Sequence, residues 1–118
     1  MVELTMLAPL LFAILFAVIQ FGILYNDYVT LTDATRAGAR KAAVSRLEAD
    51  PAGVAKRAVQ SSASDLDPTE LVVSVTPGTP WERSDDVTVA ATYPYEIDLF
   101  GLVVASGNLQ SETTERVE

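Results

Sequence analysis

The first part of the chain is a single apolar stretch with the length of a membrane-spanning helix. No charged residue occurs between Leu4 and Asn26, and Leu4–Leu24 contains thirteen Leu, Ile, Val or Phe residues. As a helix this segment reaches roughly 31 Å, which matches a hydrocarbon core of about 30 Å. Its large apolar residues favour insertion by roughly 4 to 8 kcal/mol. The pattern predicts a transmembrane-type helix, because the rest of the chain is too short to bury every face of it in a soluble core.

The sequence around this stretch differs from that of a cleaved secretory signal. Such a signal has a basic start, a shorter apolar run and small residues at its cleavage site. This chain starts Met1-Val2-Glu3, and the apolar run is followed by Tyr25-Asn26-Asp27-Tyr28, so we expect the segment to stay attached. Basic residues follow the run and none precedes it, so the positive-inside rule alone would place the C-terminal side in the cytoplasm.

The helical pattern continues beyond the apolar run, up to Arg46. Apolar and small residues recur every three or four positions, at Tyr28, Leu31, Thr35, Gly38 and Ala42. One continuous helix from Leu4 to Arg46 would be roughly 65 Å long. Pro9 removes a backbone donor and Gly22 loosens the helix, so kinks are expected near both.

Small residues recur at four-residue spacing in two parts of this helix. They are Ala13 and Ala17 in the apolar run, and Ala34, Gly38 and Ala42 beyond it. Small side chains let another backbone come close, whether it belongs to a neighbouring helix or to the protein's own sheet. Alanine is also simply a good helix former, an explanation that does not extend to Gly38.

Glu3 is the acidic residue at the start of the apolar run. Near a helix N-terminus a carboxylate interacts favourably with the helix dipole. If the apolar helices leave lipid and bundle together, the same carboxylate needs a partner, and the N-terminal amine of a neighbouring subunit could supply it. The residues alone leave both roles open.

Residues beyond Arg46 predict a small α+β region. Asp50-Pro51 is a typical helix start, followed by a short helix that ends near Ser64. Three strands are expected, which would form an antiparallel sheet with one face on the helices. The expected strands are Leu71–Thr76, Val87–Tyr93 and Leu109–Val117. The turn Pro77–Pro80 ends the first strand, and Pro94 ends the second.

Two further features complete this picture of the C-terminal region. A polar loop, 81–86, carries the only tryptophan, and Leu99–Ala105 forms an apolar patch on a long connection. In a lone domain the patch would be tucked under its own helix, whereas in an assembly it would press against a partner. The joint is expected between Arg46 and Asp50, which divides the chain into residues 1–46, the helix, and 47–118, the helix-plus-sheet region.

Composition argues against catalysis and against nucleic-acid binding. The chain has 16 acidic and 8 basic residues and no His or Cys. A net charge of −8 repels phosphate, and the commonest general base, thiol nucleophile and zinc ligands are missing. Asp65, Asp67 and Glu70 could touch calcium, but they lack the glycine and full ligand set of an EF-hand loop, so a solvated turn is favoured. We predict no enzyme activity, no cofactor and no metal site.

The N-terminal 45 residues resemble the TadE-like proteins of tight-adherence (Tad/Flp) pili, a branch of the type IV pilin superfamily. Members typically start V-E-F/L, have a proline a few residues later, end the apolar run with E/Q-F-G, and continue with N/D-A-x-R-x-G-A-R. The matching residues here are Val2-Glu3-Leu4, Pro9, Gln20-Phe21-Gly22 and Asp33-Ala34-Thr35-Arg36-Ala37-Gly38-Ala39-Arg40.

The resemblance implies a structural role in a filament. Such a precursor sits in the cytoplasmic (inner) membrane with its C-terminal region outside, is cut by a prepilin peptidase, and is extracted by the pilus assembly platform into a surface filament. Its partners are copies of itself and other pilins. Glu3 would correspond to the superfamily glutamate that pairs with a neighbour's amine. That glutamate is usually fifth in a mature pilin, and two residues precede Glu3 here.

The residues predicted to act in assembly all lie on the long helix: Glu3, Pro9, Ala13, Ala17, Gly22, Ala34, Gly38 and Ala42. The favoured hypothesis is a pilin or pseudopilin that polymerises through its apolar helix. A different class of function, a stationary single-pass membrane-anchored binding module that does not polymerise, is the alternative.

Overall fold

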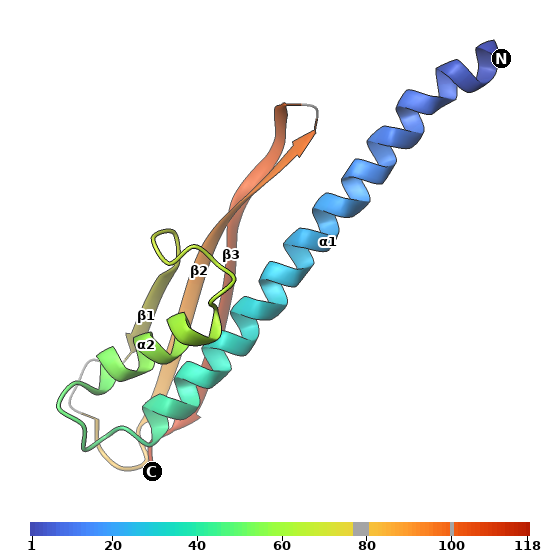
Figure 1. Cartoon of the computed structure of the whole chain (residues 1–118). Coiled ribbons are helices and arrows are strands. Elements are labelled where there is room, and N and C mark those ends of the chain that lie inside the picture. Colours follow the sequence, from blue (N-terminus) through green and yellow to red (C-terminus); the bar gives the residue numbers. More distant parts are fainter. Residues whose placement is uncertain (77–80, 100) are drawn as a thin grey trace.

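The computed structural model describes residues 1–76, 81–99 and 101–118. The chain folds into a long helix, a short helix and a three-stranded antiparallel sheet (Figure 1), which confirms the predicted α+β class. In chain order the elements are α1 (Val2–Ala43), α2 (Pro51–Ser62), β1 (Val72–Thr76), β2 (Asp86–Leu99) and β3 (Leu102–Arg116).

Helix α1 is one continuous helix that passes through Pro9 and Gly22. It starts two residues before the predicted Leu4 and ends at Ala43, three residues before the predicted Arg46. The end is set by a turn in which the Ser45 hydroxyl donates to the Lys41 carbonyl and the Ser45 N–H donates to the Ala42 carbonyl. These bonds satisfy carbonyls that the helix itself leaves without partners.

Helix α2 begins as its sequence predicts. Asp50 is the N-cap, its carboxylate accepting from the Gly53 N–H at 3.1 Å, and Pro51 occupies the first helical position, where its missing N–H costs nothing. The helix ends at Ser62, slightly before the predicted Ser64.

The β2–β3 hairpin is much longer than the sequence suggested. Strand β2 was expected to break at Pro94, yet it continues to Leu99 and pairs with β3 along the whole length. Pairing with β1 ends at Val72↔Thr92, so Pro94 lies where β2 has a neighbour on one side only. Proline is tolerated in a strand with an open edge.

The expected long connection 99–105 is also corrected. Gly101, with a φ of 82°, belongs to the hairpin turn, and β3 begins directly after it at Leu102. A bulge occurs between Ile97 and Asp98. The predicted turn Pro77–Pro80 and residue Phe100 lie outside the described residues.

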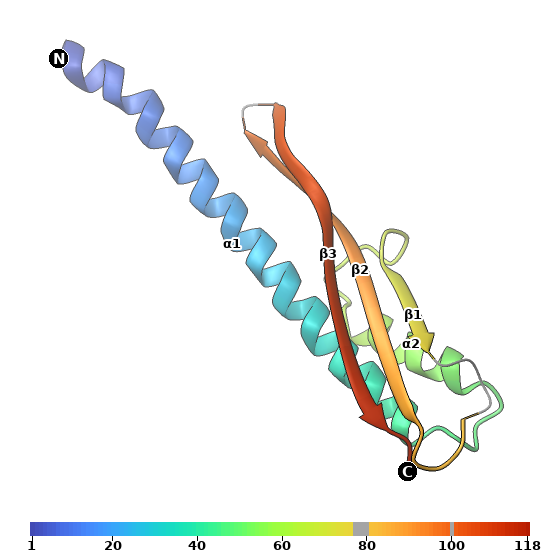
Figure 2. The same cartoon turned by 180° about the vertical axis from the view of Figure 1, so that it is seen from behind.

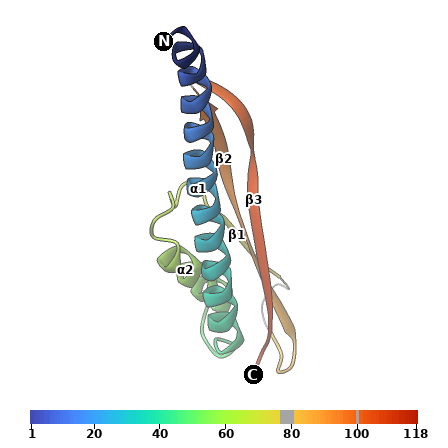
Figure 3. The same ribbon diagram turned by 90° about the vertical axis from the view of Figure 1, so that its right-hand side faces the viewer.

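The core lies between one face of the sheet and the two helices, with α1 and α2 on the same side (Figures 1 and 3). Along β2, Val87, Val89 and Ala91 are buried, whereas the opposite face of β1 is exposed. Trp81, expected in a polar loop, is buried in this core instead. The one-sided sheet therefore confirms the predicted packing.

Gly38 is the point where α1, α2 and β2 come closest. A Cβ atom built there would overlap Val59 Cγ2 of α2 and lie 3.2 Å from the Ala55 carbonyl oxygen and 3.3 Å from Val89 Cγ1 of β2. No side chain fits between these elements, which explains a glycine that helix propensity disfavours.

Hydroxyl groups of α1 and β3 form a cluster of hydrogen bonds between the two elements. We call this cluster, made by Thr32, Thr35, Ser111 and Thr113, the polar ladder. Thr35 is fully buried; its hydroxyl donates to the Thr32 carbonyl at 2.8 Å and lies 3.2 Å from the Thr113 hydroxyl. The Ser111 hydroxyl lies between Thr35 and Thr32, at 3.4 Å and 3.3 Å. Every hydroxyl of the ladder has a partner, so its burial costs little.

We expect Gly38→Ala to lower the free energy of unfolding of the globular region by about 1–3 kcal/mol, because overpacking against Val59 outweighs the gain in helix propensity. Denaturant unfolding of the full chain in detergent, followed by the fluorescence of Trp81, would measure this. Adding Val59→Ala should recover part of the loss. Gly22→Ala is the matched control, because nothing lies within 4 Å of its Cβ position. Equal unfolding midpoints for the Gly38→Ala and Gly22→Ala variants would contradict this account of the core.

Candidate assembly surface

The N-terminal part of α1 extends well beyond the sheet region (Figures 1 and 2). The whole molecule measures 71 × 21 × 19 Å. Helix α1 is long and apolar enough to span a membrane. Its most apolar part is strongly hydrophobic over 18 consecutive residues, and none of these residues is buried. A core helix of a soluble protein would be covered, so this surface is one that needs lipid or another protein.

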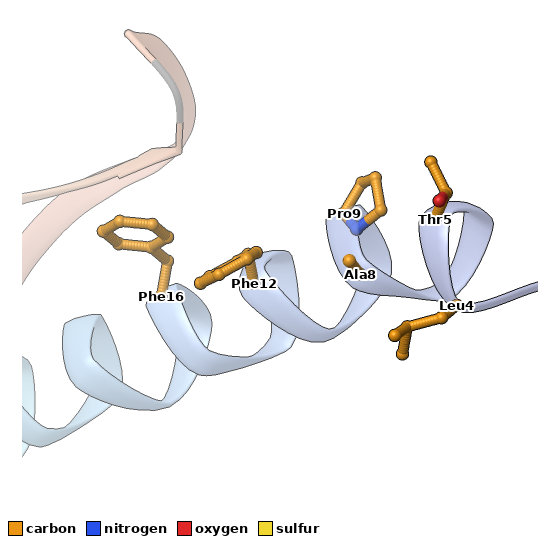
Figure 4. Close-up of a pocket in the computed structure, with 6 residues that line it drawn as sticks. All are labelled: Leu4, Thr5, Ala8, Pro9, Phe12 and Phe16. Atoms are coloured by element: carbon orange, nitrogen blue, oxygen red, sulfur yellow. The ribbon is translucent and has the colours of Figure 1, made fainter. Parts of the chain in front are cut away.

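Part of this surface is a shallow apolar depression on the first turns of α1 (Figure 4). The row Leu4, Ala8, Phe12 and Phe16 follows four-residue spacing, and Thr5 and Pro9 lie beside it. The small Ala8 side chain leaves a hollow between larger neighbours. Rows of this kind accept the side-chain ridges of another helix.

Ala13 and Ala17 lie on the face of α1 that meets the sheet further along the helix. Ala13 precedes the buried Leu31 by 18 residues, which is five turns at about 3.6 residues per turn. Both alanines are only partly exposed. The small residues of the apolar run therefore lie on the same face of α1 as the buried residues of the core, but in the part of the helix that the core does not cover.

The remaining N-terminal candidates are open to a partner. Glu3 is exposed in the first turn of α1, where it complements the positive end of the helix dipole. Gly22 has no heavy atom within 4 Å of its Cβ position. An assembly role for these residues, and for Pro9, Ala13 and Ala17, stays a prediction.

The second set of small residues is occupied within the subunit. Ala34, Gly38 and Ala42 are all buried, and Gly38 contacts α2 and β2 of its own chain. Of the two occupants that the sequence left open for this face, the structure places the protein's own sheet and second helix there. An assembly role of these three residues would act through the fold of the subunit.

The end of the β2–β3 hairpin adds exposed apolar surface that sequence reasoning placed differently. Leu102, Val103 and Val104 are 70%, 56% and 58% exposed, so these residues are not tucked under their own helix. The apolar patch was visible in the sequence. Sequence reasoning did not predict that β2 and β3 extend as far as this patch, so that the patch lies at the end of a hairpin.

Charges are distributed unevenly over the described part of the chain. Within it, the ion pairs are Arg36–Asp33 and Arg116–Asp86, both at 3.8 Å and exposed. Exposed pairs of this kind contribute little to stability. Basic side chains near the end of α1 and on α2 have no acidic partner among the described residues: Arg40, Lys41, Arg46, Lys56 and Arg57.

The acidic turn after α2 has a local structural role. The Asp67 carboxylate accepts from the Thr69 hydroxyl at 2.7 Å and from the Thr69 N–H at 2.9 Å. These bonds stabilise the ionised form and lower the pKa of Asp67. Among residues 1–76, 81–99 and 101–118, no three Asp or Glu side chains are grouped so that they could hold a metal ion.

The comparisons with known proteins agree with the N-terminal motifs. Residues 1–40 match the family model of TadE-like proteins. No curated protein and no solved structure matches the chain. The resemblance inferred from the sequence is thereby confirmed over residues 1–40, and together with the uncovered apolar helix it indicates a structural, membrane-anchored protein associated with Tad pili.

Proposed function

We propose that this protein is a pilin or pseudopilin of a type IV-like Tad pilus and that it polymerises through the apolar half of α1. The observation that carries the proposal is the uncovered apolar surface of α1 on a TadE-like N-terminal segment. In the membrane, lipid covers this surface. In a filament, the same surface would be covered by the α1 helices of other copies.

The two parts of the subunit have different tasks in this proposal. Residues 1–46 supply the helix of the filament's inner bundle, and residues 47–118 form the region that faces outward. The last turns of α1 belong to both, because they also build the core with α2 and β2. The core thus holds the apolar half of α1 in a fixed direction, as a repeating inner bundle requires.

The proposed route to the filament is the one that the similarity to TadE-like proteins implies. The precursor is held in the cytoplasmic membrane by α1, processed by a prepilin peptidase, and moved by the assembly platform to the cell surface, where other pilins join it. Glu3 enters an apolar bundle in this step. A carboxylate that leaves water needs a charged partner, and a neighbour's N-terminal amine provides one.

Imaging of sheared surface filaments by electron microscopy with helical reconstruction would test the proposal. Repeating density that fits this chain, with Leu4–Leu24 inside, would identify a major pilin. Filaments built mainly from another subunit would make it a minor pseudopilin. Permanent residence in the membrane fraction would favour the stationary membrane-anchored binding module.

We expect Ala13→Glu to abolish filaments, because it places a carboxylate on a helix face that must pack against apolar neighbours. The substitution costs about 3 kcal/mol of insertion free energy, less than the roughly 4 to 8 kcal/mol that the apolar run contributes, so the variant should still enter the membrane. Filament yield and membrane content measure the two effects separately. Ser74→Glu, on the exposed face of β1, is the control and should leave filaments intact; normal yield from Ala13→Glu would refute the bundle.

We expect Glu3→Ala to reduce filament yield by at least about tenfold, because loss of a buried charge pair of a few kcal/mol changes an equilibrium by that factor or more. Glu3→Asp keeps the charge and should retain part of the yield. Trp81 fluorescence should be unchanged in both variants, since Glu3 is far from the core along α1. If Glu3→Ala assembles as well as the unaltered protein, the carboxylate acts only on the helix dipole.

A further inference from the structure

The β2–β3 hairpin reaches far along α1, to the level of its apolar half. Val89 packs beside Gly38 of α1, and Leu99 lies ten residues further along β2. Over these residues the strand travels ~33 Å, a distance that covers ~22 residues of α1. The end of the hairpin therefore stands level with α1 near Phe16, and Figures 1 and 3 show it alongside the N-terminal half of the helix.

This level lies inside the uncharged run of α1, Leu4–Leu24. When α1 crosses a membrane along this run, the hairpin end stands about eight helical residues, or roughly 12 Å, past the level of Leu24. That depth is less than half of a hydrocarbon core of about 30 Å, so it falls within the leaflet nearer the globular region. The lipid that surrounds α1 is therefore also the surroundings of the hairpin end.

The side chains at the hairpin end suit contact with lipid. Leu102, Val103 and Val104 are each more than half exposed. No charged residue occurs in the sequence from Leu99 to Ser111. A patch of this kind needs a cover, and the level of the hairpin end indicates that the cover is the lipid beside α1.

Two acids and the open strand edges limit how deep the hairpin goes. Glu96 and Asp98 are exposed on β2, and neither forms an ion pair within the described part of the chain. Pairing of β2 with β1 ends at Thr92, so beyond it each strand of the hairpin has one edge without a neighbouring strand. Carboxylates and unpaired backbone groups are both costly in hydrocarbon. The apolar end therefore fits the outer part of the leaflet, with the acids among the head groups.

We propose that the end of the β2–β3 hairpin is a second membrane contact of this protein. Residues 102–104 insert between the lipids beside α1, and Glu96 and Asp98 stay at the level of the head groups. The partner is zwitterionic phospholipid, because its ammonium groups attract the two carboxylates, whereas an anionic surface attracts basic residues and repels acids.

A second contact fixes the orientation of the globular region. A single membrane helix is free to rotate about its own axis, whereas a hairpin end that enters the same leaflet at the side of α1 prevents this rotation. The sheet is then held at one angle to the membrane surface. This inference concerns the membrane-anchored protein and does not depend on polymerisation.

Fluorescence quenching of the full chain in phosphatidylcholine vesicles would test the contact. The chain has no cysteine, so Val103→Cys carries a single environment-sensitive fluorophore. Nitroxide groups on the lipid acyl chains should remove most of its emission. The matched control is Val72→Cys, because Val72 is 63% exposed and Val103 is 56% exposed. Val72 pairs with Thr92, which stands level with α1 near Leu31, outside the apolar run, so this label should keep nearly all of its emission.

A third label measures the depth. On Glu96→Cys the fluorophore should be quenched by a nitroxide on the lipid head group and much less by one on the acyl chain. The reverse order of depth, with position 96 deeper than position 103, would contradict the proposed insertion. Unchanged Trp81 fluorescence checks that each labelled variant is folded.

The remaining outcomes separate this inference from the proposed function. Equal acyl-chain quenching at positions 103 and 72 would overturn the membrane contact. A label at position 103 that is shielded from both the lipid nitroxide and iodide in the water would mean that protein covers the hairpin end, which would also overturn it. The vesicles contain no filament, so either result leaves the filament proposal standing, and filament imaging tests that proposal on its own.

Discussion

The close contact at Gly38 is the interaction on which the rest of this structure depends. It brings α1, α2 and β2 together with no side chain between them, and the buried residues of the sheet collect around it. Because the contact lies near one end of α1, the core can hold that end only. The same contact thus explains both a well-packed globular region and a long helix that leaves it uncovered.

The two halves of α1 have different surroundings. Towards its C-terminus, small residues and the Thr35 hydroxyl fit the sheet within one subunit. Towards its N-terminus, large apolar residues such as Leu10, Leu11 and Ile14 are more than half exposed. Ala13 and Ala17 continue the inner line of the first part into the second. The line of small residues on α1 thus begins in the core of the subunit and continues onto the exposed half of the helix.

Much of this arrangement could be predicted from the sequence, and the exceptions have physical reasons. Apolar periodicity identified α1, and Asp50-Pro51 identified the start of α2. The length of the β2–β3 hairpin was underestimated because proline disrupts a strand only when both edges of that strand are paired. The sequence of β2 does not show that one of its edges is open at Pro94. Glu3 and Ala13 could be selected by pattern alone, whereas the packing of Gly38 required knowledge of which element would lie opposite.

The ladder between α1 and β3 also has a consequence for how the protein is made. Thr35 meets Ser111 and Thr113 across 76 and 78 positions of the chain, so the groups that complete the core are synthesised long after α1. Contacts so distant in sequence form late in folding. In the route to the filament proposed above, α1 would enter the membrane before β3 is made, and the globular region would close only after β3 had reached the same side of the membrane.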